Sequence, residues 1–178
     1  MGEHEICAKT SENVLFSTAG MPFSGRRQGT VLTSRAKYAL RASISLAELH
    51  GDRGWTSAAE LAELADVPRK FLEAILTQLR DGGIVESRRG PAGGHRLRDL
   101  PSDVSVADVI RKVDGPLAMT PCASATQFSA CDDCVDVETC RIRHVLRRAR
   151  DAVAAVLEDC SLADLAFSAP EGAREFVE

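Results

Sequence analysis

Apolar residues recur every three or four positions along residues 34–51, the stretch SRAKYALRASISLAELHG. This periodicity predicts an amphipathic helix that Ser34 caps and Gly51 ends. Residues 1–30 show no such period and mix Gly, Ser and Thr with isolated apolar residues. We therefore expect this segment to be a disordered or adventitious leader.

The next two apolar patterns predict a helix-turn-helix. Ser57 and Glu60 form a capping box ahead of LAELA, which marks the start of a second helix. Pro68 is expected as the first helical residue of PRKFLEAILTQLRDGG, and the final Gly-Gly pair ends that third helix. This prediction leaves Arg69 and Lys70 pointing outward. The inward face would consist of Phe71, Leu72, Ile75, Leu76 and Leu79.

Two short strand candidates follow the third helix. They are IVES, residues 84–87, and HRLR, residues 95–98, and the Gly- and Pro-containing RRGPAGG between them suits a hairpin tip. Such a hairpin behind a helix-turn-helix is a wing. Ser105 is then expected to cap a short helix, VADVIRKV, and a long amphipathic pattern runs from about Glu138 to Glu158. A helix of that length needs a partner for its apolar face.

Length and composition favour one core and no membrane segment. The chain has 178 residues, 44% of them hydrophobic, which is enough to bury one core of ordinary size. The sequence contains neither an apolar run of transmembrane length nor the pattern of a secretory signal. We therefore expect a cytoplasmic protein without a membrane partner.

The distribution of charge suggests a nucleic-acid partner. The net charge of −4 argues against one, but the cations of residues 34–98 lie at helix starts and around the wing. A winged helix-turn-helix meets phosphates at those places, although exposed basic residues are often only solvated. We predict double-stranded DNA as the partner, contacted by Lys37, Arg69, Lys70, Arg88, Arg89 and Arg96.

Four of the six cysteines lie in CASATQFSACDDCVDVETC, residues 122–140. Stable disulfides are rare in reducing cytosol, so the clustering favours metal or redox chemistry. The order C-x8-C-x2-C-x5-C lacks the paired C-x2-C units of a zinc ribbon, yet a single tetrahedral zinc remains open beside an iron-sulfur cluster. The other two cysteines, Cys7 and Cys160, have no neighbours that suggest ligation.

Several stretches in a fixed order carry a family resemblance: LTSRAKYALRA, VPRKFLEAILTQLRDGGIVES, RGPAGGHRL, VSVADVIRKVDGPL and LEDCSLADL. Together they resemble the winged-helix regulators of the IscR, NsrR and CymR type, over about residues 31–166. The resemblance implies a homodimer that binds a palindromic operator. It also implies a mainly α fold, a winged helix-turn-helix domain with a long C-terminal dimerisation helix. Regulators of this type begin with a methionine where this chain has Val31, so the resemblance also implies that translation starts there from a GTG codon and that residues 1–30 are an over-extended gene prediction.

The resemblance also bears on the cysteines. IscR-like members hold a cluster in this loop, commonly through three cysteines and a variable fourth ligand, whereas CymR-like members carry none. Cys134 and Cys140 keep one usual interval, but Phe128 stands where another ligand is due. Arg143 occupies the position of the IscR histidine, and Tyr38 that of the NsrR acid. The resemblance therefore implies a 2Fe-2S or 4Fe-4S cluster with an extra thiol, held by Cys122, Cys131, Cys134 and Cys140.

These expectations divide the chain into six segments: residues 1–30 as the leader, 31–100 as the winged helix-turn-helix, 101–121 as a short helix and connector, 122–140 as the cysteine-rich cluster loop, 138–166 as the dimerisation helix with a short helix after it, and 167–178 as a tail.

We expect a transcriptional regulator whose operator affinity is controlled by a cluster that senses iron, redox or nitric oxide status. The alternative is a winged-helix regulator with a structural zinc or no metal, which signals by protein contact or thiol oxidation. A ferredoxin-like carrier would have no use for a basic wing. An enzyme is not expected, because no Ser-His-Asp set, phosphate-cradling loop or carboxylate pair stands out.

Overall fold

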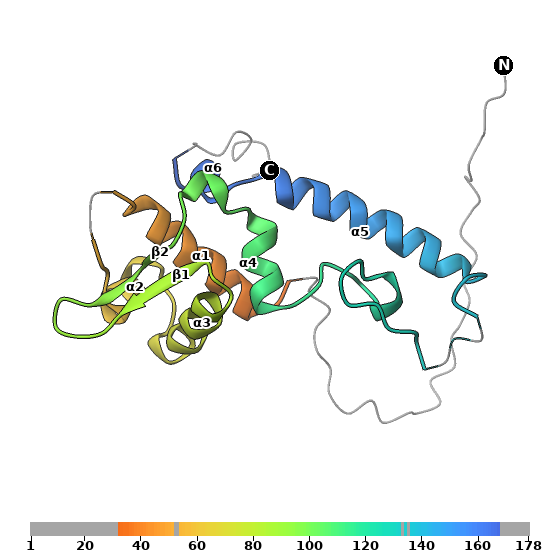
Figure 1. Cartoon of the computed structure of the whole chain (residues 1–178), viewed down its shortest axis with the longest axis horizontal. Helices are drawn as coiled ribbons and strands as arrows, with labels where there is room; N and C mark the ends of the chain where they lie inside the picture. Colours follow the sequence, from red (N-terminus) through yellow and green to blue (C-terminus); the bar gives the residue numbers. More distant parts are fainter. Residues whose placement is uncertain (1–31, 52–53, 133, 135, 168–178) are drawn as a thin grey trace, which may run out of the picture. The chain divides into compact units, whose positions relative to one another are not determined.

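The computed structural model of the protein describes residues 32–51, 54–132, 134 and 136–167. The expected leader, residues 1–30, lies outside these ranges, as does nearly all of the expected tail. The described residues are mainly helical with one antiparallel hairpin, in agreement with the predicted fold class. In chain order the elements are α1 (Ser34–Glu48), α2 (Ala58–Leu64), α3 (Arg69–Asp81), β1 (Val85–Arg88), β2 (Gly94–Leu97), η1 (Pro101–Asp103), α4 (Val106–Val113), η2 (Pro121–Ala123), α5 (Arg141–Asp159) and α6 (Leu162–Phe167) (Figure 1).

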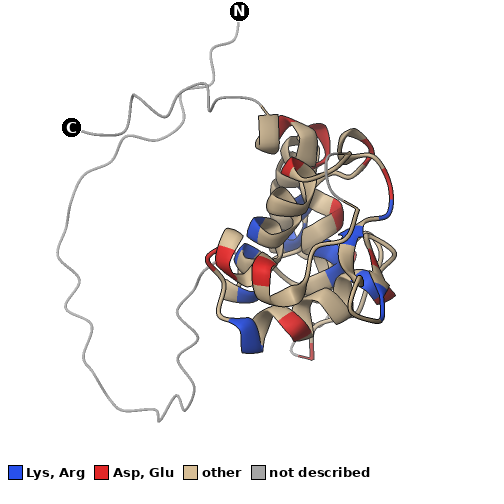
Figure 2. Ribbon diagram, turned by 90° about the vertical axis from the view of Figure 1, so that its left-hand side faces the viewer, with Lys and Arg blue, Asp and Glu red and all other residues tan. Residues whose placement is uncertain are grey.

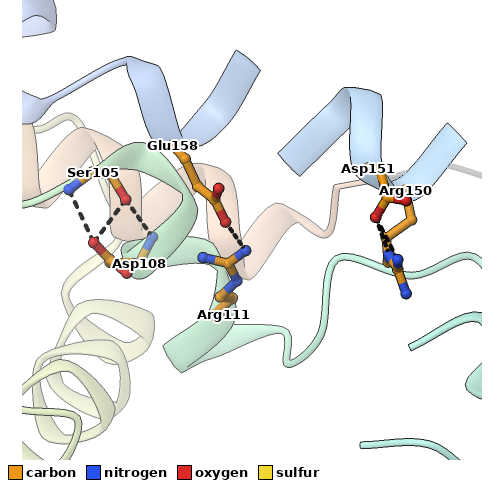
Figure 3. A network of polar contacts seen from close by, with 6 residues as sticks. All are labelled: Ser105, Asp108, Arg111, Arg150, Asp151 and Glu158. Carbon is orange, nitrogen blue, oxygen red and sulfur yellow. Dashed lines mark hydrogen bonds and ion pairs between the residues drawn. The ribbon is translucent and has the colours of Figure 1, made fainter. Parts of the chain in front are cut away.

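Two predicted helix caps are confirmed. The Ser57 hydroxyl accepts a hydrogen bond from the Glu60 N–H at 3.2 Å at the start of α2. At the start of α4, the Ser105 hydroxyl accepts from the Asp108 N–H, and the Asp108 carboxylate accepts from the Ser105 N–H, both at 3.1 Å (Figure 3). Each such cap stabilises its helix by about 1 kcal/mol.

Two other helix starts differ from the prediction by one residue. Thr33, not Ser34, caps α1, because its backbone is extended and its hydroxyl accepts from the Ala36 N–H at 3.2 Å. Pro68 lies at the N-cap of α3 instead of the first helical position. Its φ of −59° suits either position, and its ψ of 126° keeps it outside the helix.

One hydrophobic core joins α1, α2 and α3 to the hairpin and α4. On α3, the inward residues Leu72, Ile75, Leu76 and Leu79 are each at most 1% exposed, as predicted. Full burial of a side chain of this size contributes about 1.5–3 kcal/mol. Phe71 is also predicted to face inward, but it is 47% exposed, and its ring stacks on Tyr38 of α1 at the first turn of α3.

The hairpin is hydrogen-bonded to the segment before α2. Strands β1 and β2 pair in the register Val85↔Leu97 to Arg88↔Gly94, each one residue away from the predicted bounds. The backbones of Thr56 and His95 exchange hydrogen bonds of 3.0 and 2.7 Å. A Cβ at Gly94 would lie 2.4 Å from the Thr56 carbonyl oxygen, so only glycine permits this close approach.

Helix α5 is the long C-terminal helix, but it begins at Arg141 instead of about Glu138. The Asp136 carboxylate accepts hydrogen bonds from the Glu138 N–H and the Thr139 hydroxyl, and this local turn occupies the residues expected to be helical. None of the residues of α5 is buried. No helix in the described part of the chain is long and apolar enough to cross a membrane.

Candidate DNA-binding surface and cysteine site

Two cations stand at the start of α3. Arg69 and Lys70 are both exposed, as predicted. The Arg69 Nε lies 3.1 Å from Glu73 Oε1, one turn further along the helix. The Lys70 Nζ lies 4.8 Å from the centroid of the Phe71 ring, and that ring stacks on Tyr38 of α1 at 6.2 Å. The start of α3 thus presents two positive charges beside the exposed Phe71 ring, which stacks on the partly buried Tyr38.

The three arginines of the hairpin have two different environments. Arg88, at the end of β1, and Arg89, in the following turn, are exposed. Arg96 donates from Nε and Nη2 to Glu86 on the opposite strand at 3.0 and 2.9 Å. Its guanidinium also lies 4.5 Å from the centroid of the Trp55 ring. Arg96 therefore ties the hairpin to the segment before α2, while the other two arginines extend from the turn.

Lys37 is the remaining predicted DNA contact, and it is exposed on the first turn of α1. Its neighbour Tyr38 contacts Phe71 of α3, which places the start of α1 beside the start of α3. Acidic residues are interspersed with the basic ones along the described ribbon (Figure 2). The sequence analysis did not identify Glu73 and Glu86, the acids that form ion pairs with Arg69 and Arg96. The spacing of four residues between Arg69 and Glu73 on a helix could have indicated the first of these pairs.

Electrostatic effects link the four predicted cysteines, Cys122 with Cys131, Cys134 with Cys140, and Cys122 with Cys134. A hydrogen bond with Thr120, at 3.3 Å, lowers the pKa of the Cys122 thiol, and a hydrogen bond with Cys131 acts in the same direction. Burial raises the pKa of the Cys134 thiol, and the adjacent Cys140 raises it further through its charge and a hydrogen bond. Cys122 is buried in η2, and the other three thiols are partly exposed.

The donor set suits a soft metal or cluster, but it is not gathered around one point. In residues 32–51, 54–132, 134 and 136–167, no three His, Cys, Asp or Glu side chains are grouped as ligands of one ion. Thiolates are nevertheless the ligands that iron-sulfur clusters and structural zinc share. The four cysteines therefore fit either group by their chemistry, provided that their thiols converge on one point.

A family model described as an iron-dependent transcriptional regulator, Rrf2, matches residues 32–168. The chain belongs to the Rrf2 family. The predicted resemblance is therefore confirmed, and the protein is a DNA-binding transcriptional regulator, not an enzyme.

Individual Rrf2 relatives match most of the chain. An HTH-type regulator described as rrf2-like, from Rhodobacter capsulatus, is 38% identical over 138 residues, 76% of this chain and 91% of the relative. IscR from Vibrio atlanticus is 31% identical over 134 residues, 75% of this chain and 73% of the relative. The solved structure of CymR, the global cysteine regulator of B. subtilis, matches with a TM-score of 0.60 and 31% identity, over 76% of this chain and 95% of CymR.

These relatives confirm the winged-helix fold of the Rrf2 protein, with α5 as its long C-terminal helix. They do not separate the IscR type from the CymR type, because this chain is 33% identical to CymR from Bacillus subtilis and 31% identical to IscR from Vibrio atlanticus. The residues of the 122–140 loop are therefore the basis for proposing a cluster.

Proposed function

We propose that this Rrf2-family regulator is a homodimer that binds a palindromic operator with an affinity set by an iron-sulfur cluster in the loop of residues 122–140. One observation carries the proposal. Four cysteines, Cys122, Cys131, Cys134 and Cys140, lie within residues 122–140, in the segment between α4 and α5.

The DNA-contacting surface would consist of the start of α3 and the hairpin turn. In winged helix-turn-helix proteins the second helix of the motif enters the major groove, and the wing reaches the flanking backbone or minor groove. Exposed cations occupy both places in this chain. We assign the groove and phosphate contacts to Lys37, Arg69, Lys70, Arg88 and Arg89, with Arg96 acting at the base of the wing.

A second copy of α5 is the partner that the proposal assigns to this helix. Ile142, Val145 and Val156 are 69%, 65% and 70% exposed, on a helix that has no buried residue in the single chain. Pairing of two such helices about a two-fold axis would cover these side chains. The same axis would place the two α3 helices to read half-sites about 34 Å apart.

The cluster would be held by the four cysteines of the loop. When bound, such a group supplies a centre that reacts with oxidants and nitric oxide and that depends on iron supply. The four thiols would have to converge on the cluster, and the loop would change shape as they do. Cluster gain or loss would thereby alter the segment between α4 and α5.

Contacts between α4 and α5 would pass this change to the DNA-binding part. Arg111 of α4 forms an ion pair with Glu158 near the end of α5 (Figure 3). The backbones of Ser105 and Ser161 form an isolated bridge, so that the start of α4 is also tied to the residues after α5. A shift of α5 would therefore move α4 and, through the shared core, α3.

Purification without oxygen tests the proposal. We expect a coloured protein that contains iron and sulfide, and a change in operator affinity when the cluster is removed or exposed to nitric oxide. The comparison needs matched samples of one preparation with and without the cluster, measured by fluorescence anisotropy on the protein's own promoter. A colourless protein with stoichiometric zinc would overturn the cluster and leave DNA binding intact.

Thiol oxidation is a second candidate for the signal, because the loop carries four thiols and interactions among them shift the pKa of Cys122 and of Cys134. A two-electron oxidant could join two of them in a disulfide, and Cys122 with Cys131 or Cys134 with Cys140 are the pairs that we expect. In that case the iron-free protein would itself respond to peroxide. Mass spectrometry of the oxidised peptides would identify the pairs, and dithiothreitol would reverse the change in operator affinity.

A further inference from the structure

Two arginines of α5 hold the turn that carries Cys122. The Nε–H of Arg143 donates to the Cys122 carbonyl oxygen at 3.0 Å, and Arg150 donates to the carbonyl oxygen of the next residue, Ala123. The Arg143 side chain is only 15% exposed and the Arg150 side chain only 13%. Hydrogen bonds from charged donors are stronger than neutral ones, and these two are largely shielded from water.

The surroundings fix the Arg143 side chain in its place. Its guanidinium lies 5.5 Å from the centroid of the Phe128 ring, and its Nη1 lies 3.7 Å from Glu138 Oε1. Arg150 is held similarly, through an ion pair with its neighbour Asp151 (Figure 3). Each guanidinium therefore has a partner other than the carbonyl that it contacts, and this limits the positions it can adopt.

The spacing of the cysteines makes the contact between α5 and the Cys122 turn important. Eight residues separate Cys122 from the next cysteine, and a flexible segment of that length would not fix the position of the Cys122 thiol relative to the other cysteines. Part of the segment is ordered locally, because the Ser124 hydroxyl accepts from the N–H groups of Thr126 and Gln127. This local turn does not connect the Cys122 main chain to α5, and the two arginines provide that connection.

We propose that Arg143 is a positioning residue that fixes Cys122 as a ligand of the cluster. A guanidinium remains protonated and offers no lone pair to a metal, so Arg143 acts through the Cys122 main chain and not as a ligand. Helix α5 then contributes to the site by hydrogen bonds to the Cys122 turn. The inference rests on the proposed cluster in the 122–140 loop, and it adds that the place of Cys122 follows the place of α5.

The first test needs no metal. The Cys122 side chain is only 5% exposed, and it should react slowly with iodoacetamide in the cluster-free protein. We expect Arg143→Met to raise its alkylation rate about tenfold, which corresponds to the loss of one charge-assisted hydrogen bond. Rates are measured residue by residue with peptide mass spectrometry. Arg148→Met, an equal change at an exposed position of α5, is the matched control and should leave the rate unchanged.

The second test uses the loaded protein. We expect Arg143→Met to lose its iron to a chelator about tenfold faster than the wild type and to change its visible circular dichroism, with Arg143→Lys intermediate, because lysine keeps a charged donor of different reach. In a Cys122→Ser background, Arg143→Met should have no further effect, since both changes remove the same ligand. Matching thermal unfolding curves would show that the variants remain folded.

Different results overturn different statements. Equal Cys122 alkylation in Arg143→Met and in the wild type would overturn the positioning role, and so would equal chelator resistance in a wild type that binds iron. Additive effects of Arg143→Met and Cys122→Ser would show that Arg143 acts elsewhere and would also overturn it. A wild type that binds no iron would overturn the proposed cluster, and the ligand role of Cys122 with it.

Discussion

The Nε of Arg69 lies 3.1 Å from Glu73 Oε1, and both side chains are more than half exposed at the start of the helix that we assign to the major groove. An exposed pair of this kind contributes only about 0.2–1 kcal/mol to folding. Its larger effect is electrostatic, because Glu73 offsets one of the two cations that α3 offers to a phosphate.

We therefore expect Glu73→Gln to increase affinity for non-specific DNA and to steepen its salt dependence by about 0.9 for each additional phosphate contact. The midpoint of thermal unfolding should change little. Glu63→Gln, the same charge change at an exposed position of α2, serves as the control. Fluorescence anisotropy with random duplexes over a range of salt concentrations measures both quantities. An effect of equal size in the control would mean that only net charge matters.

Arg88 and Arg89, the exposed arginines at the hairpin turn, should contribute to binding without sequence preference. Removing both, in Arg88→Ala with Arg89→Ala, should reduce the salt dependence of operator binding by about 1.8, the value for two phosphate contacts. Arg96→Ala should act differently, because Arg96 bonds to Glu86 and lies over Trp55. It should lower stability and alter Trp55 fluorescence. Unchanged salt dependence in the double variant would contradict the assignment of the wing.

The periodic parts of the fold could be predicted from the sequence, and the contacts between distant residues could not. The apolar spacing located α1, α3 and α5, and Ser57 and Ser105 marked helix starts correctly. Such signals are local. The bond between Arg143 and Cys122 joins residues 21 positions apart, and no propensity encodes it. The cysteine pairs likewise depend on how the loop folds, which the spacing alone leaves open.

Gly94 should be intolerant of any side chain. A Cβ there would lie 2.4 Å from the Thr56 carbonyl oxygen, and its φ of +154° is unfavourable for other residues. Gly94→Ala should therefore destabilise the fold by about 1–3 kcal/mol, through overpacking and backbone strain. Gly54→Ala, where a Cβ would meet nothing within 4 Å, should be close to neutral. Urea unfolding followed by Trp55 fluorescence would compare them, and equal midpoints would refute the expectation.

His95 should make stability depend on pH. Burial lowers the pKa of its imidazole in the folded protein, and the charge of Arg80 lowers it further. The unfolded chain then binds the proton more readily, so His95 contributes stability above its ordinary pKa of about 6.5 that is lost as the pH falls through the lowered folded value. His95→Asn should flatten this part of the profile of unfolding free energy against pH. An unchanged slope would assign the dependence to other groups.

A charge in the middle of the exposed apolar face of α5 should separate the proposed dimer. Val145 is 65% exposed in the single chain, and a neighbouring copy of α5 would bury it. Val145→Arg should then place an unpaired charge in an apolar interface, at a cost of several kcal/mol, and yield a monomer whose operator affinity falls because only one half-site is bound. Arg147→Glu, on the same helix but outside the apolar face, should stay dimeric. Analytical ultracentrifugation over a range of concentrations measures the mass of the assembly in solution. A Val145→Arg protein that keeps the dimeric mass of the wild type would show that the interface lies elsewhere.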